Sequence, residues 1–333
     1  MEIKKIDLAL QGGGAHGAYT WGVLDRLLDD ERIEIDGVSG TSAGAMNAIC
    51  VVYGLKLGGR LKAKEKLNEF WLKISEAGKT SPLQPSFIDK SLSQGNIDYS
   101  PGYRLFSLIS ELYTPKQLNP LGINPLEAVL NDVIDFEVLH KISPPKLFVC
   151  ATNVLNCESK VFSKQEINSK TVLASACLPF MFDAVQIDGE YFWDGGYTGN
   201  PLITPLIEQT TETNDILLIQ INPKIIKSMP KNVEEIRDRV NEISFNSSLL
   251  QELKFLLYQQ EILGKGFDDG GKIKPVFLHN ISADKDLEDL NLSSKLNSTY
   301  SFLLYLKELG RNACDLWIKK NFELVGKQTT LKF

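Results

Sequence analysis

The chain has 333 residues, of which 43% are hydrophobic and 23% are charged, and its formal net charge is -6. This composition is typical of a folded protein with a sizeable core and argues against disordered and fibrous chains. The acidic balance also argues against nucleic acid as the main partner, because phosphate binding needs a concentrated basic surface. No apolar run reaches the roughly 20 residues that span a bilayer, and the N-terminus has no signal-peptide core. We therefore expect a cytoplasmic protein, although membrane association or export by another route is compatible with the sequence.

Cysteine usage predicts neither a disulfide framework nor a metal site. The five cysteines are odd in number, lie mostly in apolar runs and lack paired spacing; they are Cys50, Cys150, Cys157, Cys177 and Cys314. No cluster of histidine, cysteine and acidic residues has metal-ligand spacing, and no calcium-binding loop is present. We expect free thiols, no metal and no cofactor.

The chain opens with a predicted strand at 6–10, a glycine-rich turn and an amphipathic helix. The amides of such a turn can bind an anion, with help from the helix dipole. One interpretation is a dinucleotide site, because Gly12, Gly14 and Gly17 match its fingerprint and Glu34 or Asp36 could bind the ribose. The other is an oxyanion hole formed by amides around Gly13, Gly14 and Ala15.

The next segment reads as a strand at 33–38, a sharp turn and a buried helix at 43–53. The turn contains Gly-x-Ser-x-Gly, with Gly40, Ser42 and Gly44 at the defined positions. Such a turn strains the serine backbone and projects its hydroxyl at the helix N-terminus, whereas the structural alternative is a serine that only caps the helix. Because adjacent parallel strands end side by side, the two turns can face one another. This arrangement favours acyl transfer.

The remaining elements predict one larger α/β fold. Residues 78–122 lack sustained periodicity and are interpreted as a variable, lid-like insertion. Residues 223–333 are expected to complete the same globule as 6–222. The expected helices are 61–74, a short one from 124, 171–177, 233–263 and 301–320, and the expected strands are 147–151, 159–162, 185–187, 191–193, 215–221 and 275–279.

A serine nucleophile needs a base, and the chain has only three histidines, His16, His140 and His279. Only His279 lies late enough for the order of serine, acid and histidine found in α/β-hydrolases. The alternative is a dyad with Asp194, which precedes two glycines at the end of a predicted strand, although an aspartate there is commonly a turn-former. A second Asp-Gly-Gly at 269–271 lacks the preceding aromatic strand and is interpreted as a loop.

Three ordered motifs, at 12–17, 40–44 and 194–196, resemble those of the patatin-like phospholipase family, as do residues 174–180 and 200–201. The resemblance covers residues 6–222 and implies a three-layer α/β/α sandwich with a mostly parallel central sheet. It also implies lipid acyl-ester hydrolysis by a Ser-Asp dyad. Carried over to this sequence, it makes Ser42 the nucleophile, Asp194 the base and Gly12 to Gly14 the oxyanion hole; the other motif glycines are Gly17, Gly40, Gly44, Gly195 and Gly196. His16 departs from the family pattern, because many members have Arg or Lys there.

The expected substrate is a phospholipid or another acyl-ester lipid, hydrolysed without calcium. Peripheral membrane contact and a protein activator that opens 78–122 are compatible with this interpretation. The broad apolar stretch at 249–258 favours core packing over membrane docking. The alternative function is a nucleotide- or acyl-group-binding protein that uses the glycine turn without hydrolysis.

Overall fold

The structure is a computed structural model that describes residues 3–141, 145–209, 212–226, 228–266, 270 and 273–332. Its strands form one sheet in the order β5-β6-β3-β2-β1-β7-β8, with β4 also paired to β3. The strands are β1 (Lys4–Leu10), β2 (Ile33–Thr41), β3 (Lys146–Asn153), β4 (Ser159–Ser163), β5 (Val185–Ile187), β6 (Glu190–Asp194), β7 (Asp215–Gln220) and β8 (Phe277–Ser282). The run β3-β2-β1-β7-β8 is parallel, whereas β4 and β6 pair antiparallel with β3. The mostly parallel α/β sheet expected from the resemblance is confirmed.

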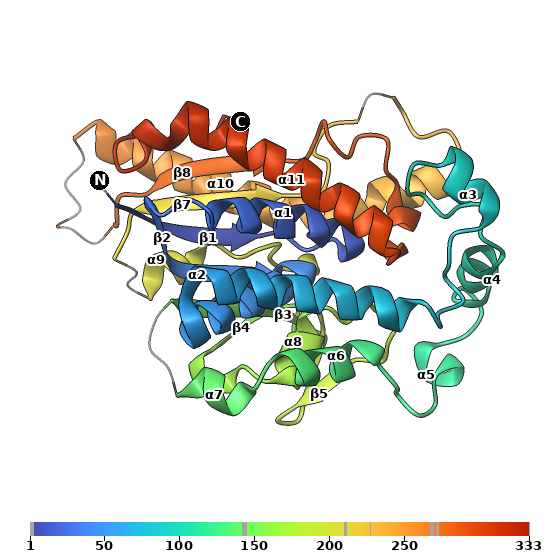
Figure 1. Ribbon diagram of the computed structural model, residues 1–333. Coiled ribbons are helices and arrows are strands. Elements are labelled where there is room, and N and C mark those ends of the chain that lie inside the picture. Colours follow the sequence, from blue (N-terminus) through green and yellow to red (C-terminus); the bar gives the residue numbers. More distant parts are fainter. Residues whose placement is uncertain are drawn as a thin grey trace.

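Helices cover both faces of this sheet (Figure 1). The α-helices are α1 (Gly17–Leu27), α2 (Ala43–Gly78), α3 (Phe87–Leu92), α4 (Pro101–Ile109), α5 (Pro115–Leu118), α6 (Pro125–Val133), α7 (Phe136–His140), α8 (Ser169–Ser175), α9 (Thr204–Glu208), α10 (Val233–Gly264) and α11 (Tyr300–Asn321). Short 3₁₀ helices are η1 (Gly14–His16), η2 (Lys164–Glu166), η3 (Gly195–Tyr197), η4 (Leu292–Leu296) and η5 (Phe322–Leu324). The larger core cluster lies between the sheet and α1, α2 and α11, and the smaller one lies under α9 and α10. The predicted three layers are therefore present.

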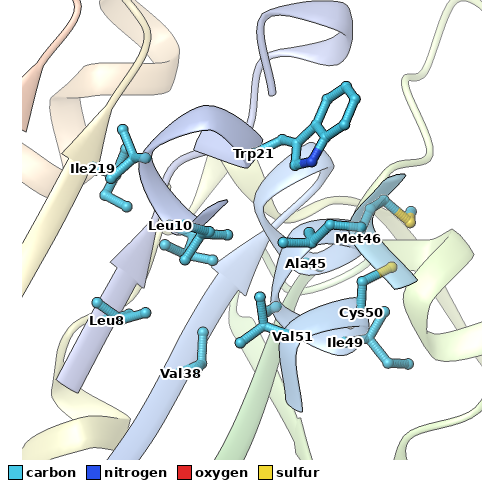
Figure 2. Packing of buried hydrophobic residues seen from close by; sticks show 14 of the residues in the cluster. Leu8, Leu10, Trp21, Val38, Ala45, Met46, Ile49, Cys50, Val51 and Ile219 are labelled. Atoms are coloured by element: carbon cyan, nitrogen blue, oxygen red, sulfur yellow. The ribbon is translucent and has the colours of Figure 1, made fainter. Parts of the chain in front are cut away.

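The central strands are apolar because both of their faces are buried, as is usual in a parallel sheet. On one face, Leu8 and Leu10 of β1 pack with Val38 of β2 against the start of α2, where Ala45 and Ile49 lie (Figure 2). Burying each large aliphatic side chain contributes about 1.5–3 kcal/mol relative to leaving it exposed. This packing fixes the ends of β1 and β2, which carry the two predicted motifs.

The segment 78–122 contains three short helices, α3, α4 and α5, where the sequence predicted no sustained periodicity. Each begins at a side-chain cap, formed by Ser86, Ser100 and Thr114. Helices of 4 to 9 residues are too short to display a helical repeat, so capping rather than periodicity marks them. The predicted helices 43–53 and 61–74 both lie in α2, which is broken at Gly58 and Gly59.

The C-terminal part of the chain joins the same sheet through β8, which pairs with β7. On one face, α10 buries Leu249, Leu253 and Leu256 in the smaller cluster, as the predicted core packing requires. Phe255 and Tyr258 of the same stretch are exposed, so the core packing predicted for 249–258 holds for only one side of the helix. On the other face, α11 lies along α1 (Figure 1). The two helices touch through Gly22 and Gly310, where a Cβ atom on either residue would overlap the backbone of the other helix. The second Asp-Gly-Gly, at 269–271, lies mostly outside the described residues.

Candidate active site

Ser42 occupies the sharp turn between β2 and α2. Its backbone has φ 55° and ψ -124°, in a region that costs a non-glycine residue about 1–3 kcal/mol. Its hydroxyl makes no capping hydrogen bond to α2, so the structural alternative of a helix cap is not supported. The Ser42 amide donates to the hydroxyl of Ser175 in α8 at 2.9 Å. Helix α8 thus holds the backbone of the turn, and the Ser42 side chain makes no hydrogen bond to the N-terminus of α2.

Asp194 ends β6 and is completely buried. Its Oδ1 accepts a hydrogen bond from the Gly196 amide at 2.7 Å. Among the described residues, Oδ2 has no partner with full hydrogen-bond geometry. Burial raises the pKa of the Asp194 carboxyl to about 7, although the Gly196 amide, the Ser42 hydroxyl and the Lys295 ammonium all act to lower it. The Ser42 hydroxyl therefore lies beside a carboxyl whose pKa is close to neutral pH.

The glycine turn lies directly against Ser42. A Cβ atom on Gly12 would be only 2.6 Å from the Ser42 Cβ. The parallel pairing of β1 with β2, which sets Leu10 opposite Gly40, explains this approach. The expectation that the two turns face one another is therefore met by the geometry.

The amides of the turn are not equivalent. The Gly12 amide donates to Asn200 Oδ1 at 2.6 Å and is therefore occupied. In the described part of the chain, the amides of Gly13, Gly14 and Ala15 have no acceptor. Three of the four residues predicted for an oxyanion hole thus present an open N–H group. Gly12 instead provides the close approach to Ser42.

The other motif glycines lie where elements meet without room for a side chain. Gly40 and Gly44 contact one another across the turn. At Gly17, an added Cβ atom would contact the side chains of Ala43 and Trp71. At Gly44 and Gly195, it would overlap the backbone carbonyls of Leu10 and Cys150. At Gly196, it would overlap the ring of Phe245. They therefore set the spacing of the elements around Ser42 and Asp194.

A polar network behind the glycine turn was missed from sequence. Asn222 Nδ2 donates to the Gly12 carbonyl at 2.6 Å. Gln11 Oε1 accepts from the amides of Ile221 and Asn222 at 2.8 and 2.9 Å. The Lys295 ammonium, from η4, donates to Asn222 Oδ1 at 2.7 Å. Asn222 follows the predicted strand 215–221, so its place at the same sheet edge could have been inferred, but nothing in the sequence points to Lys295.

The histidines do not complete a triad with Ser42. His279 is buried between Asp215 at 2.9 Å and Thr330 at 2.8 Å. His140 contacts the Ile167 carbonyl at 2.7 Å. His16 lies in the glycine turn, but its Nε2 contacts Ser294 Oγ at 2.7 Å. Burial, together with nearby Lys295, lowers the pKa of His16 to about 3, so the ring is neutral at neutral pH.

The acids sought for a dinucleotide site lie away from the glycine turn. Glu34 and Asp36 are near the beginning of β2, whereas the turn follows the C-terminal end of β1. Glu34 lies 3.6 Å from Lys5, and Asp36 accepts from the Glu212 amide. This placement does not support ribose binding next to the turn. Over the described ranges, no three His, Cys, Asp or Glu residues gather as a metal site, and no helix is long and apolar enough to cross a membrane.

Comparison with known proteins identifies the family. The patatin-like phospholipase family model matches residues 8–207, which include Ser42, Asp194 and the glycine turn. The structure is also similar to the crystal structure of VipD from Legionella pneumophila, with 16% sequence identity and a TM-score of 0.45. The matched region covers 96% of this chain and 67% of the VipD chain. Among curated proteins, no match was found. Since the family model covers more than half of the sequence, the chain belongs to the patatin-like phospholipase family.

Proposed function

We propose that this protein hydrolyses lipid acyl esters, as a phospholipase A or lysophospholipase, with Ser42 as nucleophile and Asp194 as base. The observation that carries the proposal is the strained Ser42 beside a buried carboxyl that has an oxygen without a full hydrogen bond. Membership of a lipid acyl hydrolase family supports the substrate class. The glycine turn, which contacts Ser42, supports a site for the oxyanion.

In the proposed reaction, the Ser42 oxygen attacks the ester carbonyl while Asp194 accepts its proton. The open amides of Gly13, Gly14 and Ala15 donate to the oxyanion of the tetrahedral intermediate. The intermediate collapses with loss of the alcohol or lysolipid, which takes the proton from Asp194. Water then attacks the acyl-enzyme by the same steps, releasing the fatty acid and restoring Ser42.

The environment of Asp194 suits this role. A carboxyl with an ordinary pKa near 4 is a weak base at neutral pH. Burial of Asp194 raises its pKa to about 7 and makes the carboxylate a stronger proton acceptor. Because the base form must be ionised, turnover should rise with pH and level off above about pH 7. No metal takes part in these steps, so we expect activity to persist in EDTA.

Fatty-acid release from phospholipid micelles and from a short-chain ester tests the proposal. Purified wild type should release fatty acid, and Ser42→Ala and Asp194→Asn should each reduce the rate by at least about 10³-fold. Ser159→Ala and Asp183→Asn are matched controls, since both residues are exposed and lie outside 78–122. Circular dichroism establishes that each variant is folded. An inactive wild type, or full activity in Asp194→Asn, would contradict the dyad.

We also propose that residues 6–222 form the catalytic core and that residues 223–333 complete the same globule.

We further propose that the lid-like segment 78–122 contacts the lipid surface. Support for the lipid contact comes from exposed apolar residues on α4 and the following turns, including Leu105, Leu108, Leu112 and Leu121. Apolar side chains exposed together are typical of a contact surface. Leu105→Glu with Leu108→Glu should weaken co-sedimentation with phosphatidylcholine vesicles and spare short-chain ester hydrolysis. Equal losses on both substrates would contradict a surface role.

A further inference from the structure

Lys295 brings a positive charge to the glycine turn from outside the segment that matches the family model. It lies in η4, and its backbone and side chain pack against Gly14. A Cβ atom on Gly14 would come within 3.2 Å of the Lys295 Cβ. Two hydrogen bonds connect the ammonium to the turn, since Lys295 donates to Asn222 and Asn222 donates to the Gly12 carbonyl. Lys295 is therefore connected by hydrogen bonds, through Asn222, to Gly12, which contacts Ser42.

The ammonium of Lys295 is only partly satisfied within the described chain. Its hydrogen bond goes to a neutral amide oxygen, and no described carboxylate lies at ion-pair distance from it. The nearest acidic groups of α10 are engaged elsewhere. Asp238 accepts from the Leu292 amide at 3.2 Å, and Glu242 pairs with Arg239 at 2.9 Å. A half-buried ammonium with unused donors is suited to an anion.

The titratable groups that face Lys295 come from three elements. They are Asp238 and Glu242 from α10, Asp194 from β6 and the neutral His16 from η1. Burial lowers the pKa of Lys295 below its ordinary value, and the three acids oppose this shift because they favour the charged form. Around Asp194, the neighbouring Cys150, Cys177 and Tyr197 have pKa values raised by burial, so they are neutral at neutral pH.

We propose that Lys295 is a positioning residue of this site, which holds the glycine turn through Asn222 and supplies positive charge for the anion that forms beside the turn. The inference rests on the proposed hydrolase function for the identity of that anion. Since His16 is uncharged, this role falls to a residue about 280 positions later in the chain. The cation also favours the ionised form of Asp194, the form that accepts the Ser42 proton.

Three substitutions separate charge from hydrogen bonding. Lys295→Gln keeps a donor for Asn222 but removes the charge, Lys295→Met removes both, and Lys295→Arg restores the charge. Lys285→Met is the matched control, because Lys285 is exposed and its loss changes the net charge equally. Carbon-13 NMR titration of the Asp194 carboxyl measures the electrostatic link without any turnover. The kcat/KM on an uncharged soluble ester, recorded against pH, measures the effect on catalysis.

In Lys295→Gln we expect the Asp194 pKa to rise by about one pH unit, a size typical of a single charge at an effective dielectric constant near 20. The acidic limb of the pH profile should move by the same amount, and kcat/KM above this limb should fall about 10-fold or more. Lys295→Arg should recover most of the rate, whereas Lys285→Met should resemble wild type.

An unchanged Asp194 pKa in both Lys295→Gln and Lys295→Met would overturn the electrostatic role. A shifted pKa with undiminished kcat/KM would overturn the contribution to the anion site. If Lys295→Met fails to fold, Lys295→Gln still decides between these results. Absence of ester turnover in wild type, with the pKa shift present, would refute the hydrolase proposal and leave the link between Lys295 and Asp194 standing.

Discussion

Replacing Asp194 with asparagine should stabilise the fold while abolishing turnover. Asparagine has the same shape, and its Oδ1 can still accept from the Gly196 amide. Its NH₂ group would occupy the position of Oδ2, which lacks a fully formed hydrogen bond in the described chain and lies near the Ser42 hydroxyl. The substitution therefore removes a buried charge without leaving a new cavity.

The size of the stabilisation expected for Asp194→Asn follows from the pKa of the Asp194 carboxyl. Burial raises it from 3.8 to about 7, so the native state binds more protons than the unfolded state between these values. Stability must then fall as pH rises through this window and is regained as pH falls below about 4. A shift of about three pH units corresponds to ~4 kcal/mol of destabilisation above pH 7. Asparagine avoids this loss.

Urea unfolding at two pH values measures the effect. At pH 8, Asp194→Asn should exceed wild type in free energy of unfolding by about 4 kcal/mol, and at pH 4.5 by about 1 kcal/mol. Ser42→Ala is the control, because it should be equally inactive but keeps the buried carboxyl. A stability difference that does not change with pH would refute the raised pKa, and with it the reason for treating Asp194 as a strong base.

Three further outcomes are expected from Ser42 and from the glycine turn beside it. Ser42→Gly should be inactive yet about 1 kcal/mol more stable to urea than Ser42→Ala, since glycine adopts φ 55° without strain; equal stabilities would contradict strain at this turn. Asn200→Ala should cost about 1–3 kcal/mol in thermal unfolding, because the buried Gly12 amide loses its acceptor, whereas the exposed control Asn156→Ala should cost little. Gly12→Ala should lower kcat by about 10²-fold or more through displacement of Ser42, and a wild-type rate would show that the turn accommodates a methyl group.

The neighbourhood of Ser42 was predictable because it depends on local rules. Glycine-rich turns at the ends of two consecutive apolar strands must lie at one edge of a parallel sheet, and Gly12 indeed reaches Ser42. Hairpin chemistry likewise predicted β5 and β6, whose turn has Asp188 and Gly189 at positive φ. These signals require only spacing and residue type.

Other parts of the site depend on tertiary contacts that leave no local pattern. Lys295 reaches the glycine turn only because β8 and the segment after it return to the sheet edge next to Asn222. The neutrality of His16 follows from burial against Ser294 and Lys295, which the sequence around it does not reveal. The engagement of the Gly12 amide by Asn200 is equally invisible, since about 190 residues separate them.

The pairing of β1 with β7 has a practical consequence for recombinant fragments. A fragment limited to the family-model segment, 8–207, would lack β7 and leave β1 as an open edge strand with unpaired backbone groups. It would also lack α11, which packs against α1 at Gly22 and places Lys307 over Trp21, so this face of α1 would lose its cover. Such a fragment should aggregate rather than report on catalysis. Co-expression of the remaining segment as a separate chain would supply the missing strand and helix in trans.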